Sequence, residues 1–172
     1  VLFDLVLNHV DGSSKFYRKH KEWFRSKPEE FRTLNERSVS QVKSKTVFFG
    51  LPDFDHGRDD VRQFLLSVAK FWIDVGVDGF RMDAVSQIEP EFWAWFNPEL
   101  KKYAGPDFFI LGEIFEQNYF VLNEYVNSFD AIFDFYRLFL FADVFVRGAR
   151  IDYLDDAIAH DSAYTNPKLL LS

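Results

Sequence analysis

Short runs of Val, Leu, Ile and Phe alternate along this chain with segments in which apolar residues recur at helical spacing. The strand-like runs are 1–8, 77–85, 108–114, 129–133 and 168–171, and the helical segments are 58–75, 90–103, 119–127 and 135–160. Strands that alternate with helices are joined by right-handed crossovers, which makes the sheet parallel. The sequence therefore predicts an α/β fold whose sheet is either open or closed into a barrel.

The helical segment 58–75 has the clearest pattern, with apolar residues on one face and Asp59 as a candidate N-cap. Gly76 follows directly and is expected to end the helix. Within the later helices, Pro98 predicts a kink or a split, and Gly148 predicts a break.

One connection does not fit this alternation. About forty residues, 11–50, separate the first strand from its helix, whereas a βα loop usually has only a few residues. We expect a small inserted unit over 11–50 within a single domain that spans 1–172, with a short helix in the segment FYRKHKEWF. The part from 15 to 45 holds 10 Lys or Arg against 4 Glu, which is typical of a solvated surface.

The length of the chain and the sequences at its two ends suggest that it is part of a longer protein. The chain has 172 residues, 48% of them hydrophobic, which is enough for a folded core. An eight-stranded α/β barrel usually needs roughly 250 residues. Because the chain opens on VLFDLVLNH and stops in KLLLS, both of which resemble strands, we expect a fragment.

Charge and cysteine content argue against several classes of protein. A formal net charge of -7 disfavours nucleic acid as the main partner, because phosphate binding depends on clustered Lys and Arg. The most apolar stretch, 132–146, is interrupted by Asp134, Arg137 and Asp143, so we expect no membrane span. The absence of Cys excludes a disulfide framework and thiolate chemistry. We expect a soluble protein, cytoplasmic or secreted.

The segment 79–85 places charged residues on a strand. Because alternate residues share a face, Arg81 and Asp83 should point one way while Phe80 and Met82 point the other. Unpaired charge inside a sheet is costly unless the strand ends there in a cleft. Two interpretations follow: an Arg81–Asp83 ion pair that only ties strands together, or a nucleophilic carboxylate whose charged form Arg81 stabilises.

The next strand, 108–114, ends in a second carboxylate, Glu113. Neighbouring parallel strands lie about 4.8 Å apart, so we expect Asp83 and Glu113 to lie roughly 5 Å from one another. That separation is typical of retaining glycosidases, in which one carboxylate attacks the sugar and the other protonates the leaving oxygen. Glu113 has no basic residue near it in sequence, which favours the protonated acid. The alternative for Glu113 is an ordinary loop carboxylate, as we expect for Glu116.

Four motifs resemble, in order and spacing, those of the α-amylase family of glycoside hydrolases. They are Asp4 with Asn8-His9, LPDFD at 51–55, Gly79 with Arg81 and Asp83, and Gly112-Glu113. The resemblance implies a (β/α)8 TIM barrel with a small domain inserted after its third strand, and 11–50 resembles a short version of that insertion. The chain would then cover the barrel incompletely, from about the third strand to the start of the seventh strand.

The resemblance also implies roles for the charged residues. Asp83 is similar to the family's nucleophile, Arg81 to its partner and Glu113 to its acid/base. The third catalytic carboxylate lies in an Asn-His-Asp motif, which we expect beyond Ser172.

Substrate and metal ligands are implied in the same way. His9 resembles the residue that touches the sugar at the point of cleavage, and Asp4 and His56 are expected to bind substrate beside it. Asn8 and Asp53 match positions that hold a structural calcium ion in many members, and oxygen ligands suit that cation.

One stretch departs from the family pattern. Many amylases have Lys-His a little after the nucleophile, where this chain has Ser86 and Gln87. In those members the His contributes a calcium ligand, and the Lys-His pair shapes the site for the departing sugars.

We therefore expect a retaining enzyme that cleaves α-1,4, or also α-1,6, glucosidic bonds in starch, glycogen or maltooligosaccharides through a covalent glycosyl-enzyme intermediate. A 4-α-glucanotransferase or another transglycosylase of the same family is the alternative. A non-catalytic carbohydrate-binding or scaffold homologue is the third possibility. The 172-residue chain by itself is expected to be inactive, because it lacks several strands and the third carboxylate.

Overall fold

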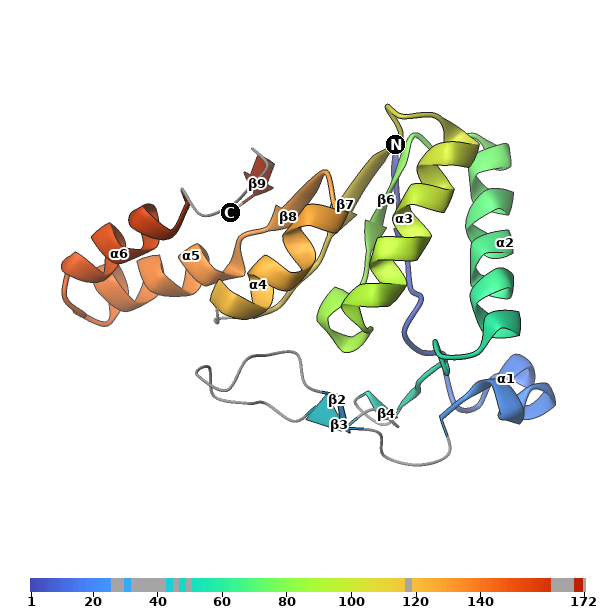
Figure 1. Ribbon diagram of the computed structural model, residues 1–172. Coiled ribbons are helices and arrows are strands. Elements are labelled where there is room, and N and C mark those ends of the chain that lie inside the picture. The colour runs from blue at the N-terminus through green and yellow to red at the C-terminus, as the bar shows by residue number, and fades with distance from the viewer. Residues whose placement is uncertain are drawn as a thin grey trace.

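The computed structural model describes residues 1–25, 51–116, 119–161 and 169–171, and within 26–50 the short strands at 30–31, 43–44 and 47–48. Five parallel strands form the central sheet in the order β1-β6-β7-β8-β9, with β1 and β9 at its edges (Figure 1). They are β1 (Leu2–Leu5), β6 (Gly79–Met82), β7 (Phe109–Gly112), β8 (Ala131–Phe133) and β9 (Leu169–Leu171). Each strand lies beside the next one in this series, so the predicted parallel α/β sheet is confirmed.

Helices connect these strands. They are α2 (Asp59–Val75), α3 (Pro90–Ala104), α4 (Tyr119–Tyr125), α5 (Phe135–Phe141) and α6 (Asp152–Asp161). Helices α2, α3 and α4 lie along one side of the sheet, while α5 and α6 project beyond the end opposite α2 (Figure 1). Short turns complete the connections: η2 (Val85–Gln87) and η3 (Val126–Ser128) are 3-10 turns, and η4 (Ala142–Val146) is π-helical.

The ends of α2 test two sequence predictions. Gly76 ends the helix in the left-handed conformation, with φ of 104°, as predicted. Asp59 is not the N-cap, because Arg58 occupies that position and no side chain caps the helix. Asp59 and Asp60 lie instead in the first turn, where acidic side chains interact favourably with the helix dipole.

Pro98 and Gly148 have different effects on the later helical segments. Helix α3 runs through Pro98 without being split, because Phe96 before it and Leu100 after it are both buried in the same core. The predicted break near Gly148 is confirmed, since the chain adopts φ of 76° there, between η4 and α6.

The predicted insertion is described only in part. The short helix expected in FYRKHKEWF is α1 (Lys15–Lys19), followed by the 3-10 turn η1 (Lys21–Trp23). Two antiparallel pairs follow, β2 (Glu30–Phe31) with β3 (Lys43–Ser44) and β4 (Val47–Phe48) with β5 (Leu51–Pro52). The rest of 26–50 lies outside the described residues.

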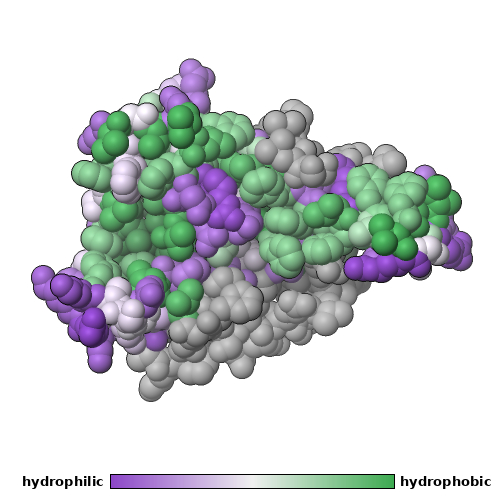
Figure 2. Space-filling view, turned by 180° about the vertical axis from the view of Figure 1, so that it is seen from behind, coloured by the Kyte–Doolittle hydropathy of each residue, from purple (hydrophilic) through white to green (hydrophobic). Residues whose placement is uncertain are grey.

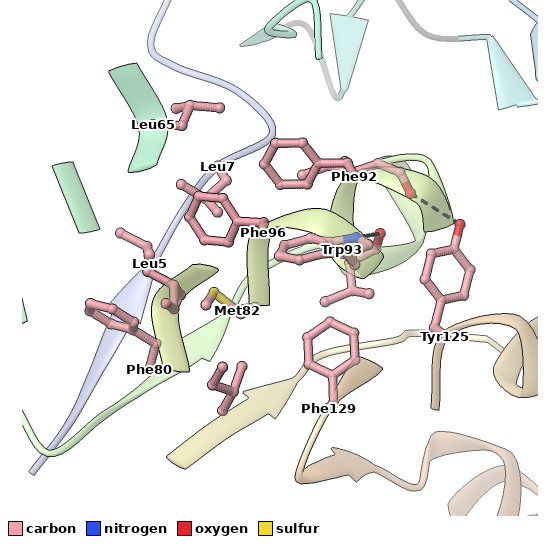
Figure 3. Close-up of a cluster of buried hydrophobic side chains, with 14 of the residues drawn as sticks. Leu5, Leu7, Leu65, Phe80, Met82, Phe92, Trp93, Phe96, Tyr125 and Phe129 are labelled. Atoms are coloured by element: carbon pink, nitrogen blue, oxygen red, sulfur yellow. Dashed lines mark hydrogen bonds between the residues drawn. The ribbon is translucent and has the colours of Figure 1, made fainter. Parts of the chain in front are cut away.

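The hydrophobic core lies between the sheet and the helices α2 to α4 (Figure 3). Phe80 and Met82 of β6 are fully buried there, in the same cluster as Phe96 and Trp93 of α3. Arg81, between them in sequence, lies on the other face of the sheet and is only partly buried, so the predicted alternation of faces is confirmed.

Two polar contacts of the core fix the segment that follows β6. Trp93 Nε1 donates a hydrogen bond to the carbonyl of Val85 at 3.0 Å, and the Tyr125 hydroxyl donates to the carbonyl of Ile88 at 3.1 Å (Figure 3). Both donors are buried, so each would be costly to leave without its acceptor. The segment immediately after Asp83 is therefore held rigidly against α3 and α4.

Across the part of the chain that the structure describes, no helix has the length and apolar character needed to cross a membrane.

Candidate active site

Four charged side chains meet where β1, β6 and β7 end. Asp4 of β1 pairs in register with Arg81 of β6, and Arg81 pairs in register with Leu111 of β7, two residues before Glu113. Because the strands are parallel and adjacent, Asp4, Arg81, Asp83 and Glu113 lie on the same face of the sheet and near its carboxyl edge. Figure 2 shows the side of the molecule turned away from the viewer in Figure 1, where a hydrophilic patch lies within a largely hydrophobic face.

The Arg81 guanidinium joins these carboxylates. Its Nη1 donates to Asp4 Oδ1 and to Asp83 Oδ1, both at 2.6 Å, and its Nη2 forms an ion pair with Glu113 Oε1. Burial alone would lower the pKa of Arg81, but the hydrogen bonds to Asp4 and Asp83 and the charge of Glu113 raise that pKa above its ordinary value. Arg81 is therefore a permanent cation that binds three carboxylates from three strands.

The ion-paired side chains of this cluster are partly exposed. The side chains of Arg81, Asp83 and Glu113 are 23%, 20% and 24% exposed, so the ion pairs are sheltered but open to solvent on one side. The arrangement leaves both carboxylates within reach of a bound molecule.

Glu113 contacts a cation that its neighbours in sequence do not reveal. Glu113 has no basic residue near it in sequence, yet Arg81, 32 residues earlier in the chain, contacts it directly. Its other oxygen, Oε2, accepts a hydrogen bond from the backbone N–H of Ala84 at 3.3 Å. The lack of a basic neighbour in sequence therefore does not distinguish Glu113 from Asp83.

Two glycines near this site allow close packing. A side-chain Cβ on Gly79 would lie 2.4 Å from the backbone oxygen of Phe109, so β6 and β7 need glycine at that position. A Cβ on Gly112 would lie 3.0 Å from the ring of Phe129. The ring of Phe129, an aromatic side chain of the core, therefore packs directly against the backbone of Gly112.

A second polar group lies just beyond β1. Residues Asn8 and Asp53 are 1% and 3% exposed, and Asn8 Nδ2 donates to Asp53 Oδ1 at 3.0 Å. The two segments are also held by the backbone, because Phe54 N–H donates to the carbonyl of Asn8 at 2.8 Å. The amide oxygen of Asn8 is buried and has no hydrogen-bond partner among the described residues.

The chemistry of this pair fits a hard cation in part. A buried amide oxygen beside a carboxylate is the donor type that Ca²⁺ prefers, although that ion takes six to eight oxygen ligands. Within the described ranges, no three or more His, Cys, Asp or Glu side chains come together as a metal site. Asn8 and Asp53 would supply two of the ligands.

The two histidines predicted to bind substrate have different surroundings. His9 is partly buried, and its Nδ1 lies 3.4 Å from Asn8 Nδ2. His56 is 1% exposed, its Nε2–H donates to the carbonyl of Leu7 at 2.9 Å, and its ring packs edge-on against Phe92 at 4.9 Å between centroids. The His56 ring is thus enclosed and ties the end of β1 to α3, so its burial gives no support to the prediction that it contacts substrate.

One buried charge was missed in the sequence. Arg25 belongs to the basic stretch that was expected to be solvated, yet its side chain is only 3% exposed. Its Nε donates to the carbonyl of Phe54 at 3.1 Å, and its Nη2 donates to Glu89 Oε1 at 2.8 Å. Arg25 therefore links the insertion to the segment that carries Asp53 and to the start of α3. Its partner lies 64 residues away, so no local pattern marks this arginine as buried.

The departure from the family pattern falls in a turn. Ser86 and Gln87 lie in η2, directly after the Asp83 segment, and Ser86 is buried. Neither side chain offers the imidazole nitrogen or the cation of a Lys-His pair.

Comparisons with known proteins agree with this geometry. The family model "Alpha amylase, catalytic domain" matches residues 1–149. Alpha-amylase 3 of Dictyoglomus thermophilum is 30% identical over 152 residues, which is 78% of this chain and 30% of that protein. A cyclomaltodextrinase of a Bacillus species is 30% identical over 148 residues, covering 78% of this chain and 25% of its own length. The chain thus spans less than a third of these relatives.

Solved structures share the fold as well. The crystal structure of an Anoxybacillus alpha-amylase superposes with a TM-score of 0.78 and 28% identity, covering 99% of this chain and 38% of that one. The match over residues 1–149 includes Asp4, Arg81, Asp83 and Glu113. This chain therefore belongs to the α-amylase family and carries part of its catalytic domain.

Proposed function

We propose that the protein containing this chain is a retaining glycosidase that cleaves α-1,4 glucosidic bonds in starch, glycogen or maltooligosaccharides. The observation that carries the proposal is the binding of Asp83 and Glu113, at the ends of adjacent strands, to the two Nη atoms of Arg81. Donors of one guanidinium hold the two carboxylates near one another, and a short separation favours retention, because inverting enzymes need a wider gap to seat a water molecule. The names of the relatives, an alpha-amylase and a cyclomaltodextrinase, support the class of substrate.

The first chemical step uses both carboxylates. A carboxylate oxygen of Asp83 attacks the anomeric carbon as the bond from that carbon to the leaving oxygen breaks, and the Glu113 carboxyl gives its proton to the leaving oxygen. The product is a sugar esterified to Asp83, and Glu113 is then a carboxylate.

The second step restores the enzyme. Water attacks the anomeric carbon from the side that the leaving group vacated, Glu113 takes a proton from that water, and the bond to Asp83 breaks. The two displacements together retain the anomeric configuration, and both carboxyl groups return to their starting protonation states.

Arg81 serves both steps in this scheme. Its positive charge stabilises Asp83 as the ionised nucleophile and fixes the positions of both carboxylates through charge-assisted hydrogen bonds. The roles of acid and nucleophile follow from the family resemblance. Asp4 and His9 are proposed to bind the sugar beside them, and the Asp4 side chain is 61% exposed.

The fold proposed for the whole protein is a (β/α)8 barrel. The five strands β1, β6, β7, β8 and β9 would be its third to seventh strands, and residues 11–50 would form the small domain inserted after the third. The strand order supports this assignment, because each strand of the parallel sheet lies beside the previous one, as in a barrel. The remaining strands and the third catalytic carboxylate would come from residues outside this sequence.

A structural calcium ion is also proposed, held in part by Asn8 Oδ1 and the Asp53 carboxylate. The support is the buried amide oxygen that accepts no hydrogen bond among the described residues. When bound, the ion would rigidify the end of β1 next to His9.

Transfer to a second sugar is the alternative to hydrolysis. The same glycosyl-enzyme can be resolved by a sugar hydroxyl in place of water, and the described site residues are equally suited to both acceptors. Product analysis separates the two, because a transferase forms chains longer than its substrate and a hydrolase forms only shorter ones.

Activity of the intact protein on starch and maltooligosaccharides tests the proposal. Asp83→Asn and Glu113→Gln should each lower turnover by about 10²-fold to 10⁴-fold or more. Asp78→Asn is the matched control, since Asp78 lies just before β6 with a side chain that is 77% exposed, and it should keep normal turnover. Near-normal turnover of either site variant would overturn the assignment.

A further inference from the structure

We propose that Ala84, the residue after the nucleophile, is a positioning residue that holds the acid/base Glu113 through its own backbone N–H. This inference rests on the proposed glycosidase function and adds a further part to the same site. Ala84 does not itself touch the substrate. It acts through Glu113.

The backbone of Ala84 has an unusual conformation. Its φ and ψ are 48° and 42°, and it is the sole non-glycine residue with positive φ in the part of the chain that the structure describes. Residues other than glycine, asparagine and aspartate rarely adopt this left-handed conformation, and such residues cluster at functional sites.

The hydrogen bonds around Glu113 show what the conformation achieves. In a regular parallel ladder, Glu113 would donate to the carbonyl of Met82 and accept from the N–H of Ala84. The first bond is present at 2.9 Å, but the carbonyl of Glu113 accepts instead from the N–H of Val85, at 3.0 Å. The ladder therefore gains one extra residue at Ala84, as in a β-bulge.

The N–H released by this bulge turns to the Glu113 side chain. Ala84 N–H donates to Oε2 at 3.3 Å, while Arg81 Nη2 binds Oε1. Each carboxylate oxygen of Glu113 thus has its own donor, one from the backbone and one from the guanidinium. Because Ala84 directly follows Asp83 in the chain, the same turn sets the position of Glu113 relative to Asp83.

The bulge is anchored from the core side. Val85 is fully buried, and its carbonyl accepts the Trp93 indole hydrogen bond at 3.0 Å. Ala84 itself is 8% exposed. The turn therefore cannot move to recover the bond to Glu113 if residue 84 prefers another backbone conformation.

Substitutions at Ala84 separate backbone conformation from volume. Ala84→Val introduces a β-branched side chain, which strongly disfavours positive φ. Asparagine has a similar volume and tolerates the left-handed conformation, and glycine tolerates it best. Ala84→Asn and Ala84→Gly should therefore recover most of the activity that Ala84→Val loses.

The leaving group of the substrate provides the readout that a general structural defect would not give. Maltopentaose needs a proton on its leaving oxygen, whereas α-maltosyl fluoride has a leaving group that departs without one. The ratio kcat/KM includes only steps up to formation of the glycosyl-enzyme, so it reports the acid role of Glu113. Measurements use the intact protein, with thermal unfolding to confirm that each variant folds.

We expect Ala84→Val to lower kcat/KM on maltopentaose by about 10-fold to 100-fold, and on α-maltosyl fluoride by less than about 3-fold. If Ala84→Val does not fold, Ala84→Ser gives the same comparison with a smaller loss, since serine adds one atom and lacks the left-handed preference of asparagine. An equal loss on both substrates, an equal loss in the valine and asparagine variants, or no loss at all would each overturn the proposal. If the wild-type protein cleaves neither substrate, the proposed function fails and the role of Ala84 fails with it.

Discussion

Asp83 and Glu113 are 30 residues apart in sequence and bind opposite Nη atoms of a single guanidinium, that of Arg81. The contact is possible because Arg81 lies on β6, in register with Leu111 of the neighbouring β7. A planar group with fixed donor directions can hold two carboxylates at a defined separation, which a flexible ammonium cannot.

The first prediction concerns this geometry. Arg81→Lys keeps the positive charge but loses the planar pair of Nη donors that binds two carboxylates. The value of kcat/KM on maltooligosaccharides should therefore fall by about 10²-fold or more. Arg58→Lys is a matched control, because Arg58 also binds a carboxylate through two nitrogens, to Asp60 at 3.0 Å and 2.8 Å, but on the surface. Steady-state kinetics of both variants test whether the guanidinium geometry of Arg81 is needed. Comparable activity in Arg81→Lys and Arg58→Lys would contradict that requirement.

Close packing of the strands leads to a second prediction, on stability. Gly79→Ala should lower the free energy of unfolding by about 3 kcal/mol, because the new Cβ would meet the backbone oxygen of Phe109. Gly112→Ala should cost about 1 to 2 kcal/mol, since the ring of Phe129 has more freedom to shift than backbone. Gly12→Ala, where the nearest atom is 3.6 Å away, serves as the control. Denaturant unfolding measures the free energy of unfolding of the three variants. A larger decrease for Gly112→Ala than for Gly79→Ala would contradict the close spacing of β6 and β7 at Gly79.

The two histidines should respond in opposite ways. His56→Ala removes a buried donor to the Leu7 carbonyl and a contact with Phe92, so it should lower the free energy of unfolding by about 2 to 4 kcal/mol. His9→Ala should leave the melting temperature nearly unchanged and lower kcat/KM by about 10-fold, as expected for a residue that contacts the sugar. Thermal unfolding and kinetics on the same samples distinguish the roles. A stable His56→Ala variant with impaired substrate binding would support the prediction that His56 contacts substrate.

Calcium binding can be tested through stability. If Asn8 and Asp53 hold the ion, millimolar Ca²⁺ should raise the melting temperature of the intact protein relative to a chelated sample, by an amount equivalent to about 2 to 3 kcal/mol at saturation. Asp53→Ala should abolish this increase. Asp55→Ala should keep it, because Asp55 binds the N–H of Gly57 and lies outside the buried pair. An equal calcium response in both variants would place the ion elsewhere.

Much of the fold was predictable because secondary structure depends on neighbours in the chain. The apolar runs at 77–85 and 108–114 predict β6 and β7, and the helical spacing of 58–75 predicts α2 to within one residue. The alternation of Arg81 with Phe80 and Met82 gives the two faces of β6 correctly, because that alternation is a property of the extended backbone.

The features that were not predictable depend on strand register and on side-chain direction. The contact of Arg81 with Glu113 requires β6 and β7 to be aligned, and the contact of Arg25 with Glu89 joins segments 64 residues apart. The left-handed conformation of Ala84 has no marker in the sequence, since alanine usually signals a helix. The burial of His56 has no marker for a similar reason: a polar turn before a helix gives no sign that the ring folds inward.

Covalent trapping tests the central claim, that Asp83 is the nucleophile of a retaining glycosidase, most directly. A 5-fluoro-α-glucosyl fluoride forms a glycosyl-enzyme readily through its good leaving group, and the second fluorine slows the hydrolysis of that ester. After brief incubation with the intact protein and protease digestion, mass spectrometry should find one added fluoroglucosyl group, on the peptide that contains Asp83, and none in the Asp83→Asn variant. A label on Glu113 or on another residue, or turnover of starch without any label on Asp83, would contradict the account.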